Sequence, residues 1–179
     1  MSCGMKPAEE PKVYDLIKKI GDEVNSVLNK RMKEKYFDNI ILLYSFIENL
    51  LKWLIYVNVV WKKCGRALLP SEEVISGKEV ESIEKICGDL RFYDSLQIAL
   101  LIDLVDLKLY RRIDRIRYDR NNLIHQFWIY TIRDDFRELR RKLLDLVGVA
   151  NELVRICKKL SKEMSPDLLW LTSLPRRRK

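Results

Sequence analysis

Residues Ile40 to Trp61 have the sequence IILLYSFIENLLKWLIYVNVVW and form the most apolar segment of the chain. A helix of this length could cross a bilayer, but Glu48 and Lys52 would each cost about 2.5–3.5 kcal/mol at the membrane centre. We therefore expect a helix buried inside a bundle or a dimer, with a membrane span as the alternative. Glu48 and Lys52 are four residues apart, in the order that favours an ion pair within one helix.

The composition of the whole chain indicates an all-α protein of one domain. The chain has 179 residues, 47% of them hydrophobic, and only 6 Gly and 5 Pro, so it contains few turn signals for a sheet. We expect an up-and-down helical bundle of about five to six helices. The bundle should occupy residues 11–162, between a flexible N-terminus at 1–10 and a C-terminal extension with a basic tail at 163–179.

Apolar residues at three- and four-residue spacing predict where the other helices lie. These helices are expected at residues 11–32, at 78–90, at 94–105, after Asp106, and in a last segment that reaches about Ser161. Short polar side chains that accept hydrogen bonds favour helix starts. The expected N-caps are Asp94 or Ser95, Asp106, and Asp134 or Asp135.

Positive charge is concentrated in one part of the chain. The net charge is +8, and residues 108–142 contain 11 Lys and Arg against 5 Asp and Glu. The last four residues, Arg176 to Lys179, are all basic. Such clustering favours a polyanionic partner, RNA or DNA, because each neutralised phosphate releases counterions. The alternative is that arginine-rich helix faces only form surface ion pairs and keep the protein soluble.

Cysteine and histidine usage gives no indication of a metal site, and we expect no cofactor. The four cysteines, at positions 3, 64, 87 and 157, form no C-x-x-C pair, and a single His cannot complete the usual zinc spacings. No apolar run follows a basic patch at the start of the chain. We therefore expect no signal peptide and a cytoplasmic protein with free thiols. A Cys64–Cys87 disulfide is the alternative.

The only histidine of the chain, His125, ends the stretch RNNLIH at residues 120–125, inside the basic region. The helix expected here has an apolar stripe, formed by Leu109, Ile113, Ile116, Leu123, Ile124 and Phe127. Arg120 occupies a position in that stripe where an aliphatic residue is expected, and a charge there needs a reason. A neighbouring face carries Arg117, Asn121, His125 and Trp128.

Arg120, Asn121 and His125 form an Arg-polar-x3-His pattern late in a long helix of a strand-poor chain. This pattern and its helical context resemble the HEPN superfamily, named for higher-eukaryote and prokaryote nucleotide-binding domains. The resemblance covers residues 11 to about 160. It implies a homodimer in which the motif helices of two subunits meet at a twofold axis and form a composite cleft for RNA. Many members are metal-independent ribonucleases, toxins or defence effectors, and others bind RNA or nucleotide without cutting it.

One branch of the superfamily is partnered by a minimal nucleotidyltransferase that acts as an antitoxin. Members of that branch have Tyr two positions after the motif His. This chain has Phe127 at that position. The resemblance thus implies a nucleotidyltransferase or antitoxin partner, but the residue two positions after the motif His does not match the branch that has such a partner.

Cutting RNA without a metal requires a base for the 2′-hydroxyl, charge stabilisation at the phosphorane and an acid for the leaving 5′-oxygen. An imidazole, with an ordinary pKa near ~6.5, suits the acid or base role, which we assign to His125. Arg120 would bind phosphate oxygens through its planar fork, and Asn121 would orient the His or hold a phosphate oxygen. Glu48, if it faces the cleft, would fix Arg120, and Arg117 would support the site.

Each of these residues could instead have a purely structural role. His125 could be a helix residue packed beside neighbouring aromatic side chains. Arg120 could instead pair with Asp119 or Asp134. Trp128 could stack on a base or pack in the core. The candidate phosphate contacts, which could also be merely solvated, are Arg111, Arg112, Arg115, Arg140 and Arg141. The competing functions are a non-catalytic RNA- or nucleotide-binding protein and a helical adaptor for another protein.

Overall fold

The computed structural model of the protein describes residues 12–66, 76–132 and 136–163, while the side chains of 12–14, 63–66, 121 and 124–132 lie outside the description. The described part is all-α, with six α-helices, one short 3-10 helix and no β-strand. These elements are α1 (Lys12–Asn29), η1 (Lys33–Lys35), α2 (Tyr36–Arg66), α3 (Gly77–Asp89), α4 (Phe92–Leu101), α5 (Leu107–Ile132) and α6 (Phe136–Glu163). The expected all-α class is therefore confirmed.

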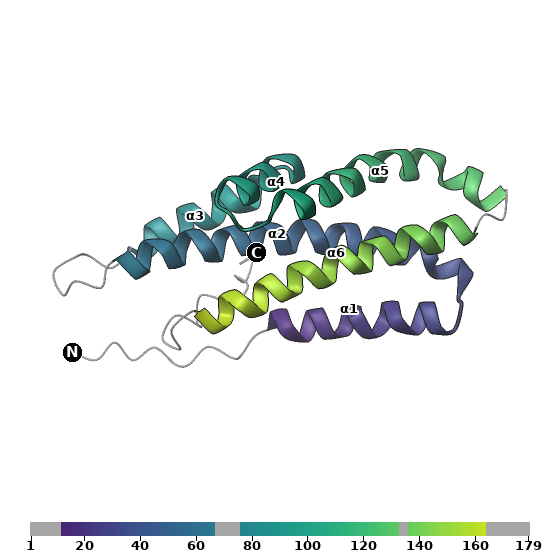
Figure 1. Ribbon diagram of the computed structural model, residues 1–179, viewed down its shortest axis with the longest axis horizontal. Coiled ribbons are helices and arrows are strands. Elements are labelled where there is room, and N and C mark those ends of the chain that lie inside the picture. Colours follow the sequence, from purple (N-terminus) through teal and green to yellow (C-terminus); the bar gives the residue numbers. More distant parts are fainter. Residues whose placement is uncertain (1–11, 67–75, 133–135, 164–179) are drawn as a thin grey trace.

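The long helix α2 is the centre of a helical bundle. It packs against α3, α4, α5 and α6. In Figure 1, α1 and α6 lie along one side of α2, while the short helices α3 and α4 and the first half of α5 lie along the other. The figure also shows that α1 and α5 run in one direction along the long axis and that α2 and α6 run in the opposite direction. Two helix layers therefore cover α2.

Nearly every side of α2 is buried, as its composition predicted. Its solvent-inaccessible side chains extend along the helix and include Ile40, Ile47, Leu51, Leu54 and Val60. Burying such a side chain contributes about 1.5–3 kcal/mol, and α2 supplies more buried apolar residues than any other described helix. By length and composition alone, Lys33–Lys62 also qualifies as a membrane span, with a mean hydropathy of 1.6. Most of that segment is covered by the rest of the bundle.

The helices on both sides present the apolar stripes that periodicity predicted. On α5 the buried positions of the stripe are Leu109, Ile113, Ile116 and Leu123. On α6 they are Leu139, Leu143, Leu146, Val149 and Leu153. The stripe positions Ile124 and Phe127 lie outside the described side chains, as do both expected caps of the last helix, Asp134 and Asp135.

The start of α4 differs from the expected one. The helix begins at Phe92 with Arg91 as its N-cap, so the prediction that Asp94 or Ser95 would be the N-cap is wrong. Asp94 accepts a hydrogen bond from Nε of Arg91 at 2.9 Å, and Oγ of Ser95 donates to the Arg91 carbonyl at 3.1 Å. Both polar side chains thus lie in the first turn and bond back to the residue before it.

A tight turn joins α4 to α5. Helix α4 ends at Leu101, earlier than the predicted end at Val105. The chain then passes through Asp103 with a φ of 57°, the left-handed region that Asp tolerates better than most residues. The side chain of Asp106 accepts a hydrogen bond from the backbone N–H of Leu109 at 2.7 Å, which confirms the predicted cap of α5.

The described cysteines are thiols. Cys87 and Cys157 are both buried, and Cys87 is a free thiol, so the alternative of a Cys64–Cys87 disulfide is wrong. Cys87 packs in the core against other apolar groups. Burial there raises the pKa of its thiol, because a thiolate is poorly solvated in apolar surroundings.

We expect the Asp106 cap to contribute measurably to the stability of the bundle. Replacing Asp106 with Ala should lower the free energy of unfolding by about 0.5–2 kcal/mol, because an N–H group of α5 loses its acceptor. Asp106→Asn keeps an acceptor oxygen and should lose much less. Urea unfolding followed by circular dichroism measures both changes. Equal losses for the Ala and Asn variants would contradict a role for the cap.

Candidate functional site

Arg120 meets α2 at the point where the apolar surface of that helix is interrupted. Its Nη1 lies 3.2 Å from Oε2 of Glu48. The other oxygen of Glu48, Oε1, lies 3.1 Å from Nζ of Lys52, which also donates to the carbonyl of Gly88 at 3.4 Å. The side chains of Arg120 and Glu48 are 34% and 21% exposed. A half-buried cluster of two cations and one carboxylate therefore joins α2, the end of α3 and α5.

These contacts answer two expectations from the sequence. The ion pair between Glu48 and Lys52 and the contact between Glu48 and Arg120 are both present. The alternative pairing of Arg120 with Asp119 is wrong, because Asp119 lies 3.6 Å from Nζ of Lys142 on α6 instead. A charge on the apolar stripe is accommodated because α2 offers a carboxylate opposite it.

The cluster carries a net positive charge. Glu48 neutralises only one of the two cations, Arg120 and Lys52, that it contacts. A guanidinium has five N–H donors in a planar fork, which is more than one carboxylate can accept. Holding the fork through Nη1 restricts its rotation. The arrangement is suited to presenting Arg120 to an anion in a fixed orientation.

An open groove of about 570 Å³ lies between the start of α4 and α5. Its lining residues are Arg91, Phe92, Tyr93, Asp114, Arg117 and Arg120. Among these described residues, three arginines lie with one acidic residue, which makes this part of the lining basic, and two residues are aromatic. Of the residues singled out from the sequence, the groove unites Arg117 and Arg120. It also contains α4 residues that the sequence did not indicate.

The guanidinium of Arg117 contacts two side chains, one on α5 and one on α4. Its Nε and Nη2 lie 2.9 and 2.8 Å from Oδ1 of Asp114, one turn earlier in α5. Its guanidinium carbon also lies 4.8 Å from the centre of the Tyr93 ring on α4, within cation–π distance. Burial raises the pKa of the nearby Tyr110 phenol, and Tyr93 and Asp114 raise it further. The phenol of Tyr110 is therefore neutral at physiological pH.

The motif positions 120, 121 and 125 all belong to the uninterrupted helix α5. The side chains of Asn121, His125 and Trp128 lie outside the described part, so their contacts stay predictions. The backbone still limits the geometry. At 3.6 residues per turn, five residues correspond to a rotation of about 140°. Position 125 therefore lies on a different side of α5 from Arg120, whereas positions 121 and 125 continue the face of Arg117 with a drift of about 40° per step.

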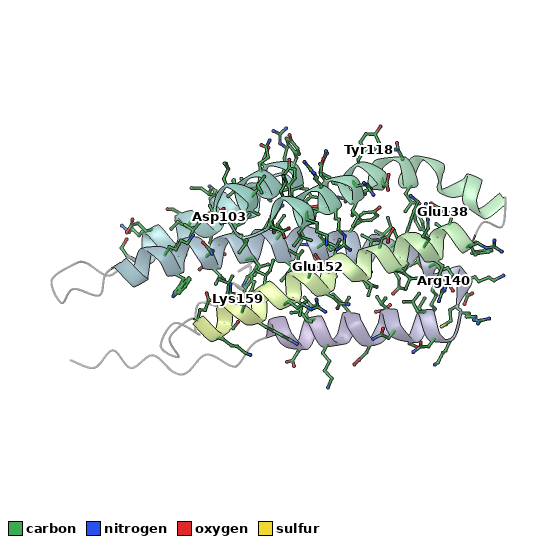
Figure 2. All side chains as sticks on the ribbon, in the orientation of Figure 1. Asp103, Tyr118, Glu138, Arg140, Glu152 and Lys159 are labelled. Carbon is green, nitrogen blue, oxygen red and sulfur yellow. The ribbon has the colours of Figure 1, made fainter. Side chains whose placement is uncertain are left out.

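The other candidate phosphate contacts fall into two groups. Arg111, Arg115 and Arg140 are exposed. Arg112 forms an ion pair with Glu152 on α6, and Gly148 leaves room for it, because a Cβ there would lie 3.0 Å from its Nη2. Figure 2 shows Tyr118, which is 66% exposed, pointing away from the bundle on the same helix as Arg111 and Arg115.

Arg141 binds Glu138 in the preceding turn through two hydrogen bonds of 2.9 and 2.7 Å. These bonds lower the pKa of the Glu138 carboxyl, and Lys142 adds to the effect. Arg112 and Arg141 thus have intramolecular partners that an RNA phosphate would have to displace. The exposed arginines of α5 and Arg140 have the better geometry for phosphate contacts.

Comparison of the chain with models of protein families, with curated proteins and with solved structures found no match. The site must therefore be interpreted from its own geometry. Its two central features are the Arg120 guanidinium held by Glu48 and the basic groove that begins at Arg120.

We expect Glu48 and Arg120 to be energetically coupled. A double-mutant cycle with Glu48→Gln and Arg120→Gln should give a coupling free energy of about 1 kcal/mol, the upper end for partly exposed ion pairs. The exposed pair Arg91–Asp94, in which the Arg91 side chain is 86% exposed, is the control and should give a coupling near zero. Equal couplings for the two pairs would show that Glu48 does not hold Arg120.

Proposed function

We propose that the protein is a HEPN-type, metal-independent endoribonuclease that acts on single-stranded RNA as a homodimer. The observation that carries the proposal is Arg120 itself. A guanidinium sits on the apolar stripe of α5, is held by an acid from another helix, and borders a basic groove. An aliphatic residue would satisfy the packing at least as well, so the retained charge favours a role in binding an anion.

The architecture agrees with this proposal. In Figure 1 neighbouring long helices are antiparallel. An up-and-down HEPN-like bundle over residues 11–162 would have the same arrangement. The motif stretch lies in α5, the long helix before the last described one. A cytoplasmic location of the protein and a homodimeric arrangement are part of the proposal.

The reaction follows from the residue types. A base removes the proton of the 2′-hydroxyl, and the 2′-oxygen attacks the adjacent phosphorus. The bond to the 5′-oxygen then breaks, and an acid protonates that oxygen. The products are a 2′,3′-cyclic phosphate and a 5′-hydroxyl end. We assign a proton-transfer step to His125 and stabilisation of the phosphorane charge to Arg120. Asn121 is assigned the orientation of the imidazole or of a phosphate oxygen.

The helix geometry favours a site shared between two subunits. Positions 120 and 125 are about 140° apart around α5, so they lie on different sides of one helix. In a dimer that meets through α5, Arg120 of one subunit can face the partner's His125 across a single phosphate. Arg111, Arg115 and Tyr118 lie about 140–180° around α5 from Arg120 and therefore do not border this phosphate.

A non-catalytic RNA-binding protein is the second candidate, and one observation favours it. The groove brings together Arg117, Tyr93 and Arg91, and binding of a phosphate by such side chains requires no proton transfer. It could therefore bind an RNA strand whether or not a proton-transfer group lies nearby. In that case the affinity would fall steeply with salt while the RNA stays intact.

The nuclease proposal predicts cleavage of labelled single-stranded RNA by the purified protein in EDTA. His125→Ala should reduce the rate by about 10²–10⁴-fold, because it removes the proton-transfer group. Arg120→Lys, which keeps the charge but not the planar fork, should also reduce it strongly. Gel analysis of the products should show cyclic phosphate ends, and a 2′-deoxy substitution at the cut site should prevent cleavage.

The matched control is Arg155→Ala, because Arg155 is exposed on α6 and distant from the site in sequence. This variant should cleave like the wild type. Circular dichroism confirms that each variant is folded. Equal cleavage by the wild type and by His125→Ala would falsify the nuclease proposal.

A further inference from the structure

The groove between α4 and α5 has features that cleavage at Arg120 does not use. Tyr93 is 41% exposed, and its ring stands in the groove beside the Arg117 guanidinium. At about 570 Å³ the groove falls within the range of about 300–1,000 Å³ that is usual for small-molecule sites. It therefore has room for one nucleotide in addition to the phosphate at Arg120.

The electrostatics of the groove suit a phosphodiester. Arg91 and Arg120 stand at its two α-helical walls, with Arg117 also in the lining. Arg91 is the N-cap of α4, and its Nε donates a hydrogen bond to Asp94 in the first turn of that helix. The N-terminus of α4 also carries the positive end of the helix dipole. Asp94 binds Arg91, and Asp114 binds Arg117. These ion pairs hold the two guanidinium groups in place and neutralise part of the positive charge of the groove.

We propose that this groove binds the nucleotide next to the cut site in single-stranded RNA, with the base stacked on Tyr93 and the phosphate beside Arg91. The inference rests on RNA being the ligand of the proposed function. An exposed aromatic ring with an adjacent arginine stacks on any base, because every base has a π-face. The site would therefore contribute affinity with little sequence preference. Its contribution should be separable from cleavage, because Tyr93 and Arg91 have no role in the proposed cleavage step.

The arginines of α5 that line the groove support this position for the RNA strand. Arg120 and Arg117 both come from α5 and line the same groove. A strand whose phosphate lies at Arg120 would therefore pass Arg117 and reach Tyr93, which contacts the Arg117 guanidinium. The exposed fraction of the Arg117 side chain, 30%, leaves it accessible from the groove.

The test measures affinity in the cleavage-deficient His125→Ala protein, by fluorescence anisotropy of a labelled single-stranded RNA in EDTA. Tyr93→Leu should weaken binding by about 5- to 150-fold, because a stacking surface is lost. Tyr93→Phe keeps the ring and should restore most of the affinity. Arg91→Ala should weaken binding and lower its salt dependence, whereas the control Arg155→Ala should do neither. Cross-linking of a 4-thiouridine RNA should label a peptide that contains Tyr93.

The outcomes separate this inference from the nuclease proposal. If the wild type cuts RNA and Tyr93→Leu binds and cuts equally well, the groove inference is overturned and the nuclease proposal stands. If Tyr93→Leu loses affinity but the wild type never cuts RNA, the groove inference stands without the nuclease. Absence of RNA binding by the wild type at low salt overturns both. Cross-links confined to peptides outside the groove overturn the groove inference.

Discussion

The burial of α2 on nearly all sides is the constraint on which the other features of the bundle depend. A helix that is apolar all round can be stable in water only when other helices cover it, and α3, α4, α5 and α6 all pack against it. Where its sequence changes to Glu48 and Lys52, the covering helix must supply a compatible partner. That partner is Arg120, at 3.2 Å from Glu48. The candidate site thus lies at the place where charged side chains interrupt the apolar core.

Stability alone gives little reason for a charged residue at position 120. Buried ion pairs are often no more stabilising than apolar residues of the same size, and exposed or half-exposed pairs contribute little. A guanidinium that interrupts an apolar stripe is therefore poorly explained by stability alone. The guanidinium of Arg120 is well explained if its N–H donors, held in place by Glu48, bind a phosphate. Arg120 also lines the basic groove together with Arg117 and Tyr93.

Sequence periodicity predicted the features that depend on one helix at a time. The stripes of α5 and α6 and the Asp106 cap follow from local spacing and local hydrogen bonding. The contact between Glu48 and Arg120 was also predictable, because two isolated charges on apolar faces must find partners. The groove was not, since it depends on how α4 crosses α5, and nothing in the stretch around Arg91 and Tyr93 marks that crossing. The capping box of Ser76 and Glu79 at the start of α3 has the local S-x-x-E pattern that can be read from a sequence.

The most direct test of the shared site is complementation between subunits. One preparation combines an Arg120→Ala subunit with a His125→Ala subunit in the same dimer, purified through two different tags. A second combines a subunit that carries both substitutions with a wild-type subunit. If Arg120 and the partner's His125 act on one phosphate, the first dimer retains one intact site and cleaves RNA, whereas the second has none and does not. Cleavage by the second dimer together with inactivity of the first would contradict the account.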